Sequence, residues 1–240
     1  MRWLAPALGP LLLGLALAAA CHPAVAGLLG GGGANRPLSL ARLSDLALNH
    51  LSLAASGFAL VAFLGLGLGL VVTRARFTAL RGSIDTLAAF AQAVPPVVVV
   101  ALALPILGFG GPPTLLALAA YGIMPTLRGT VGALESVSPE AREAARAVGL
   151  TPGQILRQVE LPLAAPGLIE TLRTAFVLAV AVTAVGALAG ASTLGTPIVA
   201  GLQNQNVVAM FQGAAAAAAL AFLGDAVLLA VGGLARRDAA

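Results

Sequence analysis

The chain has 240 residues, of which 13 are basic and nine are acidic, and its mean hydropathy is +0.99. Hydrophobic residues make up 59% of the chain and charged residues only 9%. Average proteins carry about 25% charged residues, so the composition excludes a soluble domain. The pI near 11.0 is attributed to membrane topology, because no basic groove with interleaved aromatic residues indicates nucleic-acid binding.

Several apolar runs are candidates for membrane spans, which need about 20 mostly apolar residues each. In chain order they cover residues 4–20, 51–72, 84–107, 114–127, 168–189 and 207–234. The fourth run is short, and Pro112 and Pro113 mark its start. The sequence therefore predicts an all-α integral membrane protein with about six transmembrane helices.

The first run has two interpretations. It ends just before Cys21, the only cysteine of the chain, which rules out an internal disulfide. Arg2, the apolar core and the small residues before Cys21 also fit a cleaved signal peptide or a lipoprotein signal, so a retained helix and a cleaved signal both stay open. A glycine-rich external linker follows. We therefore assign the first helix and the linker to residues 1–49, and the transmembrane domain to residues 50–237.

The orientation follows from the arginines, because the chain contains no lysine. If the N-terminus is cytoplasmic, six spans place the loops 73–83 and 128–167 and the C-terminus inside. Eleven of the 13 arginines then lie at or near the cytoplasmic side, and only Arg36 and Arg42 lie outside. This satisfies the positive-inside rule and predicts a cytoplasmic N-terminus, provided that the first helix is not cleaved.

Small and irregular residues predict packing and breaks within the spans. Gly65 and Gly69 form a small-xxx-small pair, which is typical of closely packed membrane helices. Pro95 and Pro96 are expected to interrupt the third helix, where neighbours or water must satisfy the freed carbonyls. The glycine pair is interpreted as helix packing, whereas the proline kinks either create the bend that alternating access needs or merely shape the packing, and both interpretations stay open.

The charge of the chain is concentrated in one segment, since nine of its 22 charged residues lie between positions 135 and 173. A solvated loop would explain the charge alone. It would not explain a narrow, smooth face that repeats at helical spacing in the same segment. That face consists of Ala141, Ala144, Ala145 and Val148. Because alanines allow another helix to come close, we expect this segment to dock into a groove on another protein.

The same segment contains two consecutive helix signals. Ser138 is a good N-cap and a proline follows it, while Gly149 marks the end of that helix. Thr151 and Gln154 then form a capping box for a second helix, and Pro162 is expected to limit its length. The sequence predicts two short helices, at about residues 138–162, joined by a glycine elbow on the cytoplasmic surface.

The stretch EAARAVGLTPGQILRQVELP resembles the EAA loop of bacterial ABC-transporter permeases. Its pattern is E-A-A, three residues, glycine, nine residues, then Ile-x-Leu-Pro, with valine here in place of isoleucine. The matching positions are Glu143, Ala144, Ala145, Gly149, Val159, Leu161 and Pro162. The resemblance implies that this loop sits in a cleft of an ATPase subunit and couples ATP hydrolysis to movement of the membrane helices.

Three further stretches resemble the permeases for glycine betaine, choline and related osmoprotectants. They read QAVPPVVVVALALPILGFG, YGIMPTLRGT and GASTLGTPIVAGLQNQN. The last usually reads G-A-G-G-L-G at its start, and Ser192 and Thr193 replace two glycines here. The resemblance implies an ABC importer in the bacterial inner membrane, with cytoplasmic ATPase subunits, a second permease subunit, identical or not, and an external substrate-binding protein.

The chain is not expected to be an enzyme. It has no G-x-x-x-x-G-K-[ST] loop and no lysine with which to build one, so ATP and magnesium are expected on the partner ATPase. No cofactor is expected in this chain. The two histidines, His22 and His50, are expected to lie outside the spans and are far apart in the sequence, so no metal site is expected.

Few polar residues are available to line a transport pathway. The candidates are Gln92, Thr183, Ser192, Thr193 and Asp225. A carboxylate in mid-membrane costs roughly 2.5–3.5 kcal/mol on insertion scales, so Asp225 either serves the pathway or pairs across helices, although no basic residue in the adjacent helices is an obvious partner. Thr183 either lines the pathway or bonds back to its own helix.

Two alternatives stay open. One is an ABC permease for an amino acid or another small nutrient. The other is an ATP-independent secondary transporter or channel, which would want intramembrane ionisable groups, and Asp225 is the one candidate that the sequence offers.

Overall fold

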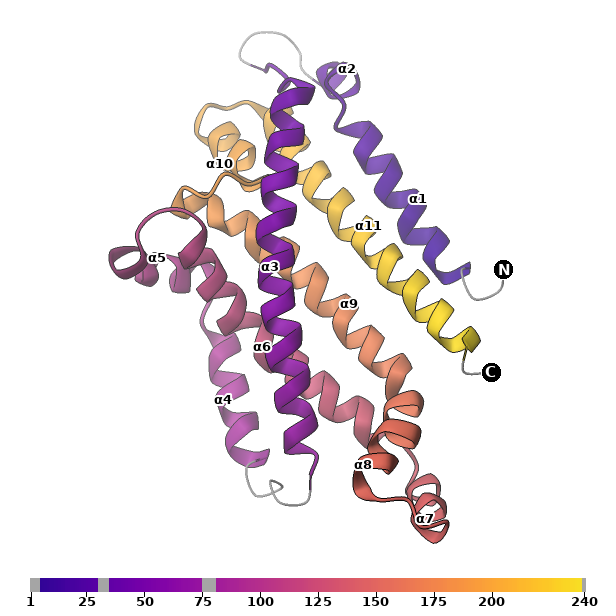
Figure 1. Cartoon of the computed structure of the whole chain (residues 1–240). Coiled ribbons are helices and arrows are strands. Elements are labelled where there is room, and N and C mark those ends of the chain that lie inside the picture. Colours follow the sequence, from indigo (N-terminus) through magenta and orange to yellow (C-terminus); the bar gives the residue numbers. More distant parts are fainter. Residues whose placement is uncertain (1–4, 30–34, 75–80, 239–240) are drawn as a thin grey trace.

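The computed structural model describes residues 5–29, 35–74 and 81–238, and every regular element in that part of the chain is a helix (Figure 1). The all-α prediction is confirmed. The elements are α1 (Ala5–Ala20), α2 (Pro23–Ala26), the 3-10 turn η1 (Gly27–Leu29), α3 (Leu40–Val72), α4 (Arg81–Ala93), α5 (Pro96–Leu107), α6 (Gly111–Glu135), α7 (Pro139–Ala147), α8 (Pro152–Ile155), the π-helical turn η3 (Leu156–Glu160), α9 (Leu161–Val185), the 3-10 turn η4 (Gly186–Ala189), α10 (Gly195–Gln203) and α11 (Val207–Asp238).

The long helices form one bundle in which successive helices run in alternating directions (Figure 1). Helices α3, α6 and α11 run toward the end of the bundle where α7 and α8 lie, and α1 and α9 run toward the opposite end. We refer to these as the α7 end and the α10 end. This alternation puts the charged segment at one end of the bundle and the short helices α2 and α10 at the other.

Three helical stretches are long and apolar enough to cross a membrane: Leu40–Val72, Pro152–Ala189 and Val207–Leu234. A fourth is added if α1 and the stretch Pro23–Leu29, bent by 68°, count as one span. The chain is thus a multi-pass membrane protein. The predicted number of six spans stays a prediction.

Several predicted boundaries are corrected by the structure. Helix α3 begins at Leu40 rather than at 51, because Ser39 caps it by accepting a hydrogen bond from the Arg42 amide; residues 40–49 therefore belong to this helix and not to a linker. The predicted third span is two helices, α4 and α5, separated at Pro95, which cannot donate a backbone hydrogen bond and disfavours helix in the residue before it. The fourth helix, α6, is longer than its apolar run.

Pro162 does not end the second surface helix, contrary to the prediction. The helix runs without a break from Pro152 to Ala189, passing through the π-helical turn Leu156–Glu160 just before the proline. A proline ring normally clashes with the carbonyl four residues earlier, and a widened π turn changes that local geometry. The short helix α8 is therefore the first turn of the long α9 helix.

Helices α3 and α6 pack closely at the predicted glycine pair, and this prediction is confirmed. A Cβ atom placed on Gly65 would lie 2.6 Å from the Cβ of Thr126, and one placed on Gly69 would lie 2.6 Å from the Cβ of Thr130. Both distances are shorter than real carbon contacts allow. Only glycine therefore permits the observed approach of the two helices.

Helix α1 packs along α11 (Figure 1) and is fastened to it by a buried glutamine. The Gln212 side chain on α11 accepts a hydrogen bond from the Leu38 amide at 2.7 Å and donates one to the Cys21 carbonyl at 2.9 Å. Gly14 of α1 lies directly against Leu223 of α11. The N-terminal helix is thus an integrated part of the bundle in this structure.

His50 lies inside the bundle, and its predicted location outside the spans is wrong because α3 begins earlier than expected. Its side chain is fully buried on α3. Nδ1 is 3.2 Å from the Leu194 amide nitrogen, and Nε2 is 3.1 Å from the Val180 carbonyl oxygen. Because an amide can only donate, Nδ1 accepts and the protonated Nε2 donates. A neutral imidazole thus joins α3 to α9 and to the turn before α10.

Replacing His50 with leucine is expected to lower the free energy of unfolding by about 2–3 kcal/mol, because the buried Leu194 amide loses its acceptor. Thermal unfolding in detergent can be followed through the reaction of buried Cys21, the sole thiol of the chain, with a fluorogenic dye. The matched control is His22→Leu, since His22 is exposed near the same end. Equal melting temperatures for the two variants would contradict the assigned role of His50.

Candidate coupling segment and membrane groove

The segment between α6 and α9 folds as two helical pieces with an elbow between them. Ser138 caps α7 by accepting a hydrogen bond from the Ala141 amide at 3.3 Å, and Pro139 opens the helix. The predicted glycine elbow is present, because Gly149 has φ of +83°, a left-handed conformation that costs other residues about 1–2 kcal/mol. Past the elbow, the amide and hydroxyl of Thr151 both donate to Gln154 Oε1 at 2.9 Å.

The seven residues of the EAA-like pattern divide by exposure. Ala145 is buried against the bundle, Val159 and Leu161 are half-buried, and the other four, Glu143, Ala144, Gly149 and Pro162, are exposed. The smooth face expected on α7 is therefore split, since Ala145 turns inward while Val148 is 77% exposed. The outward surface combines a carboxylate, small residues and one apolar side chain.

Glu160, which the sequence analysis did not single out, is the polar centre of this segment. It ends the π-helical turn, and its side chain is only 9% exposed. One carboxylate oxygen, Oε1, accepts from Arg142 Nε at 3.0 Å, and the other, Oε2, accepts from Arg74 Nη2 at 2.9 Å. Both oxygens of a buried carboxylate are thus used by arginines from different parts of the chain.

The two arginines extend this ion-pair centre to two further helix ends. Arg142, on α7, also donates from Nη2 to the Leu134 carbonyl at 2.6 Å, in the last turn of α6. Arg74 follows the end of α3 and donates from Nε to the Leu70 carbonyl at 3.3 Å and from Nη2 to Thr73 Oγ1 at 3.1 Å. Glu160, Arg142 and Arg74, here called the Glu160 cluster, therefore join α3, α6, α7 and the start of α9.

A signal for this cluster was present in the sequence. Glu160 is an acidic residue inside an otherwise apolar run, VELPLAAPG, directly before a membrane helix, where an unpaired charge would be costly. The sequence could not identify its partners, because Arg74 lies 86 positions away. Helix order and direction decide which arginines reach it.

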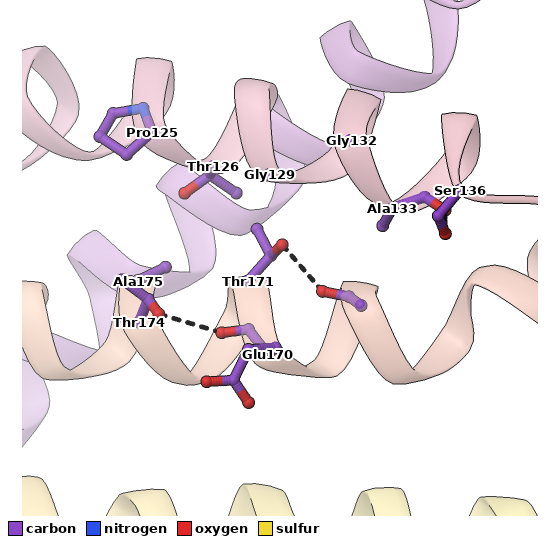
Figure 2. Close-up of a pocket in the computed structure, with 11 residues that line it drawn as sticks. Pro125, Thr126, Gly129, Gly132, Ala133, Ser136, Glu170, Thr171, Thr174 and Ala175 are labelled. Carbon is purple, nitrogen blue, oxygen red and sulfur yellow. Dashed lines mark hydrogen bonds between the residues drawn. The ribbon is translucent and has the colours of Figure 1, made fainter.

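A groove lies between α6 and α9 in the half of the bundle nearer the α7 end (Figure 2). Its volume is about 420 Å³. Small and hydroxyl-bearing side chains of both helices form its walls, together with Pro125 on α6 and the Glu170 carboxylate on α9. The Thr171 hydroxyl donates to the Gly167 carbonyl at 2.9 Å and the Thr174 hydroxyl to the Glu170 carbonyl at 3.1 Å, both within α9. Each hydroxyl oxygen keeps acceptor capacity.

The five predicted pathway residues are not brought together, and none of them lines this groove. Gln92 is exposed on α4 and Ser192 is exposed in the turn before α10. Thr193 is buried in that turn, where its hydroxyl accepts from the Gly195 amide at 3.2 Å. Thr183 is buried and bonds back to its own helix, donating to the Ala179 carbonyl at 2.7 Å.

Asp225 pairs across helices, as one of its two sequence interpretations proposed, and its partner is Arg173, which the sequence did not make obvious. Arg173 on α9 donates from Nε to Oδ1 at 2.6 Å and from Nη2 to Oδ2 at 2.9 Å, and its remaining amino group pairs with Glu170. Helices α9 and α11 run in opposite directions, so residues that lie at a similar depth from the α7 end face each other. The fork of the guanidinium fits both carboxylate oxygens.

Comparisons with known proteins agree on one family. Residues 65–237 match the family described as "Binding-protein-dependent transport system inner membrane component". The chain is 33% identical over 180 residues to the glycine betaine/carnitine/choline transport system permease protein of Bacillus subtilis (strain 168), a match that covers 75% of this chain and 78% of that protein. It is 31% identical over 191 residues to an osmoprotectant import permease protein of Salmonella typhimurium (strain LT2), with 78% and 88% covered.

The fold is also similar to a solved structure. A chain of the inward-facing MetNI methionine ABC transporter superposes with a TM-score of 0.66, covering 82% of this chain and 96% of that chain. The sequence identity is 21%, so this likeness concerns the fold alone.

Removing the carboxylate in Asp225→Ala is expected to destabilise the protein by about 3 kcal/mol, because it leaves a partly buried arginine with Glu170 as its remaining partner. The double variant Arg173→Met/Asp225→Leu is expected to recover most of that loss, since an apolar pair replaces the charges. The melting temperatures of the variants, measured through the reaction of the Cys21 thiol with a fluorogenic dye, rank their stabilities. Glu170→Ala is the control, and it is expected to change stability little because Glu170 is exposed. A double variant no more stable than Asp225→Ala would contradict this account.

Proposed function

This chain belongs to the family of binding-protein-dependent transport system inner membrane components, and we propose that it is the permease subunit of an ABC importer for a small osmolyte such as glycine betaine or choline. The observation that carries the proposal is the pairing of an EAA-like segment, folded as an outward-facing elbow, with close similarity to permeases named for these substrates. The permease is not itself a catalyst.

The substrate assignment rests on the shared chemistry of the relatives' substrates. Glycine betaine, carnitine and choline each carry a quaternary ammonium group, which proteins usually hold between aromatic faces. Among the described residues, the aromatic pair in contact is Phe58 and Phe176, whose rings pack edge to face with centroids 5.5 Å apart in the interior. We therefore assign tight recognition to an external binding protein and weak passage to this chain.

The coupling assignment rests on the exposed part of the EAA-like segment. Glu143 would supply the polar anchor for a cytoplasmic ATPase subunit, Ala144 would allow close approach, and Gly149 would set the angle of the elbow. ATP and magnesium would bind the ATPase, since this chain has no lysine for a phosphate-binding loop. The α7 end would then be cytoplasmic, and the start of α1 would lie on that same side of the membrane.

The groove between α6 and α9 is the best-supported part of a substrate path in this chain. It lies between two helices whose ends are at the α7 end, and hydroxyls, small residues and the Glu170 carboxylate line it. A second permease subunit would close its open side. An ATP-independent transporter is less well supported, because the intramembrane carboxylate that it would use, Asp225, is occupied by Arg173.

The test of the proposed function is a pull-down of the tagged chain from its native membrane in mild detergent, with partners identified by mass spectrometry. The expected partners are a P-loop ATPase and a binding protein rich in aromatic residues. Glu143→Arg is expected to lose the ATPase, whereas Asp45→Arg, an exposed acid near the α10 end, is expected to retain it. Recovery of the chain alone in several detergents would overturn the importer assignment.

Gly149→Val is expected to reduce substrate uptake at least about tenfold while the protein still inserts into the membrane, because a β-branched residue is strained at a φ of +83°. The elbow would open and change the angle that α7 presents. Gly153→Val is the matched control, since Gly153 is exposed in the same segment, has ordinary φ and has open space around its Cβ position. Equal uptake of labelled choline or glycine betaine by the two variants would contradict a role for the elbow.

A further inference from the structure

Helix α7 is attached to the rest of the protein mainly by polar contacts. Of its nine residues, Ala145 is the one that is buried, so apolar packing contributes little to its position. The strongest link is Arg142, whose guanidinium reaches both the Glu160 carboxylate and the Leu134 carbonyl. A planar guanidinium that donates in two fixed directions sets orientation as well as distance.

Glu160 connects Arg142 of α7 to the membrane helices. It terminates the π-helical turn that leads without interruption into α9. Its second oxygen holds Arg74, which is bonded in turn to the last turn of α3. With two arginines and one carboxylate, removal of the carboxylate would leave two cations facing each other.

The groove lies directly beyond these contacts. Leu134, whose carbonyl accepts from Arg142, lies in the last turn of α6 beside Gly132 and Ala133, which line the groove together with the C-cap residue Ser136. The opposite wall is α9, which begins immediately after Glu160. The Glu160 cluster thus connects α7 to both walls of the groove, in addition to the short chain connections at residues 136–138 and 148–151.

We propose that Glu160 is the positioning residue that transmits displacement of α7 to α3, α6 and α9, and so changes the width of the groove between α6 and α9. This inference rests on the proposed function, in which an ATPase moves α7. Energetic coupling between distant sites is carried by such contiguous networks of ion pairs and rigid helices. Glu160 acts here through Arg142 and Arg74 and does not touch the substrate.

The test uses the complete complex of this chain with its ATPase and binding protein, reconstituted in liposomes, with labelled glycine betaine and choline as probes. The readout is the number of substrate molecules transported per ATP hydrolysed. Glu160→Gln is expected to lower this ratio at least tenfold while the ATPase still copurifies. Arg142→Lys keeps the charge balance but loses the two-directional fork, and is expected to lower the ratio in the same direction.

The matched control is Glu140→Gln, which removes an exposed carboxylate from the same helix, α7, and is expected to stay within twofold of the wild type. Because ATP hydrolysis belongs to the separate ATPase, misfolding is excluded by comparing only variants that insert and copurify with the ATPase in wild-type amounts. An unchanged ratio in both Glu160→Gln and Arg142→Lys would therefore overturn the transmitting role. If the wild-type chain binds no ATPase, the proposed function itself fails and this inference fails with it.

Discussion

A buried polar group in a membrane bundle needs a partner within the protein, because the hydrocarbon core of a membrane offers none. In the described part of the chain, the buried Thr114 hydroxyl is an exception to this rule. This constraint explains features that share no sequence motif. The His50 ring bridges an amide and a carbonyl, Gln212 holds the N-terminal segment, and Asp225 is paired with Arg173. The π-helical turn before Pro162 concerns the backbone: it lets the helix continue through a proline, which cannot donate a backbone hydrogen bond. Each of the three side-chain interactions connects two elements. The buried polar groups therefore also fix the relative positions of the helices.

The buried polar groups differ in kind between the two ends of the bundle. At the α10 end, neutral hydrogen bonds from His50 and Gln212 fix the connecting residues Leu194, Leu38 and Cys21 to the long helices α3 and α11. At the α7 end, the Glu160 cluster fixes an exposed helix with charges, which are directional and sensitive to small displacements. Between them, Gly65 and Gly69 let α3 and α6 meet at close range. A displacement of α7 would therefore act on two helices, α3 and α6, that are closely packed against each other.

Local features of this fold were predictable from the sequence, and long-range pairings were not. Helix caps, the glycine elbow and the glycine pair depend on neighbouring residues or on helical spacing, and the structure contains all three. The partners of Asp225 and Glu160 depend on helix direction and relative depth, which composition and periodicity do not specify. His50 was misplaced for a related reason: apolar content set the start of α3 at residue 51, whereas the cap at Ser39 sets it at Leu40. For α3, the capping signal at Ser39 therefore marks the start of the helix better than hydropathy does.

The Glu160 cluster is more informative about function than about stability. Replacing a buried ion pair with apolar residues of similar volume often leaves stability unchanged or increases it, so folding alone does not require two arginines around one carboxylate. What apolar residues could not supply is a link with fixed direction between an exposed helix and three membrane helices. Arg142 provides that link by holding Glu160 and the Leu134 carbonyl at once. The link therefore fixes the position of α7 relative to α3, α6 and α9, and a displacement of α7 would act on these helices through it.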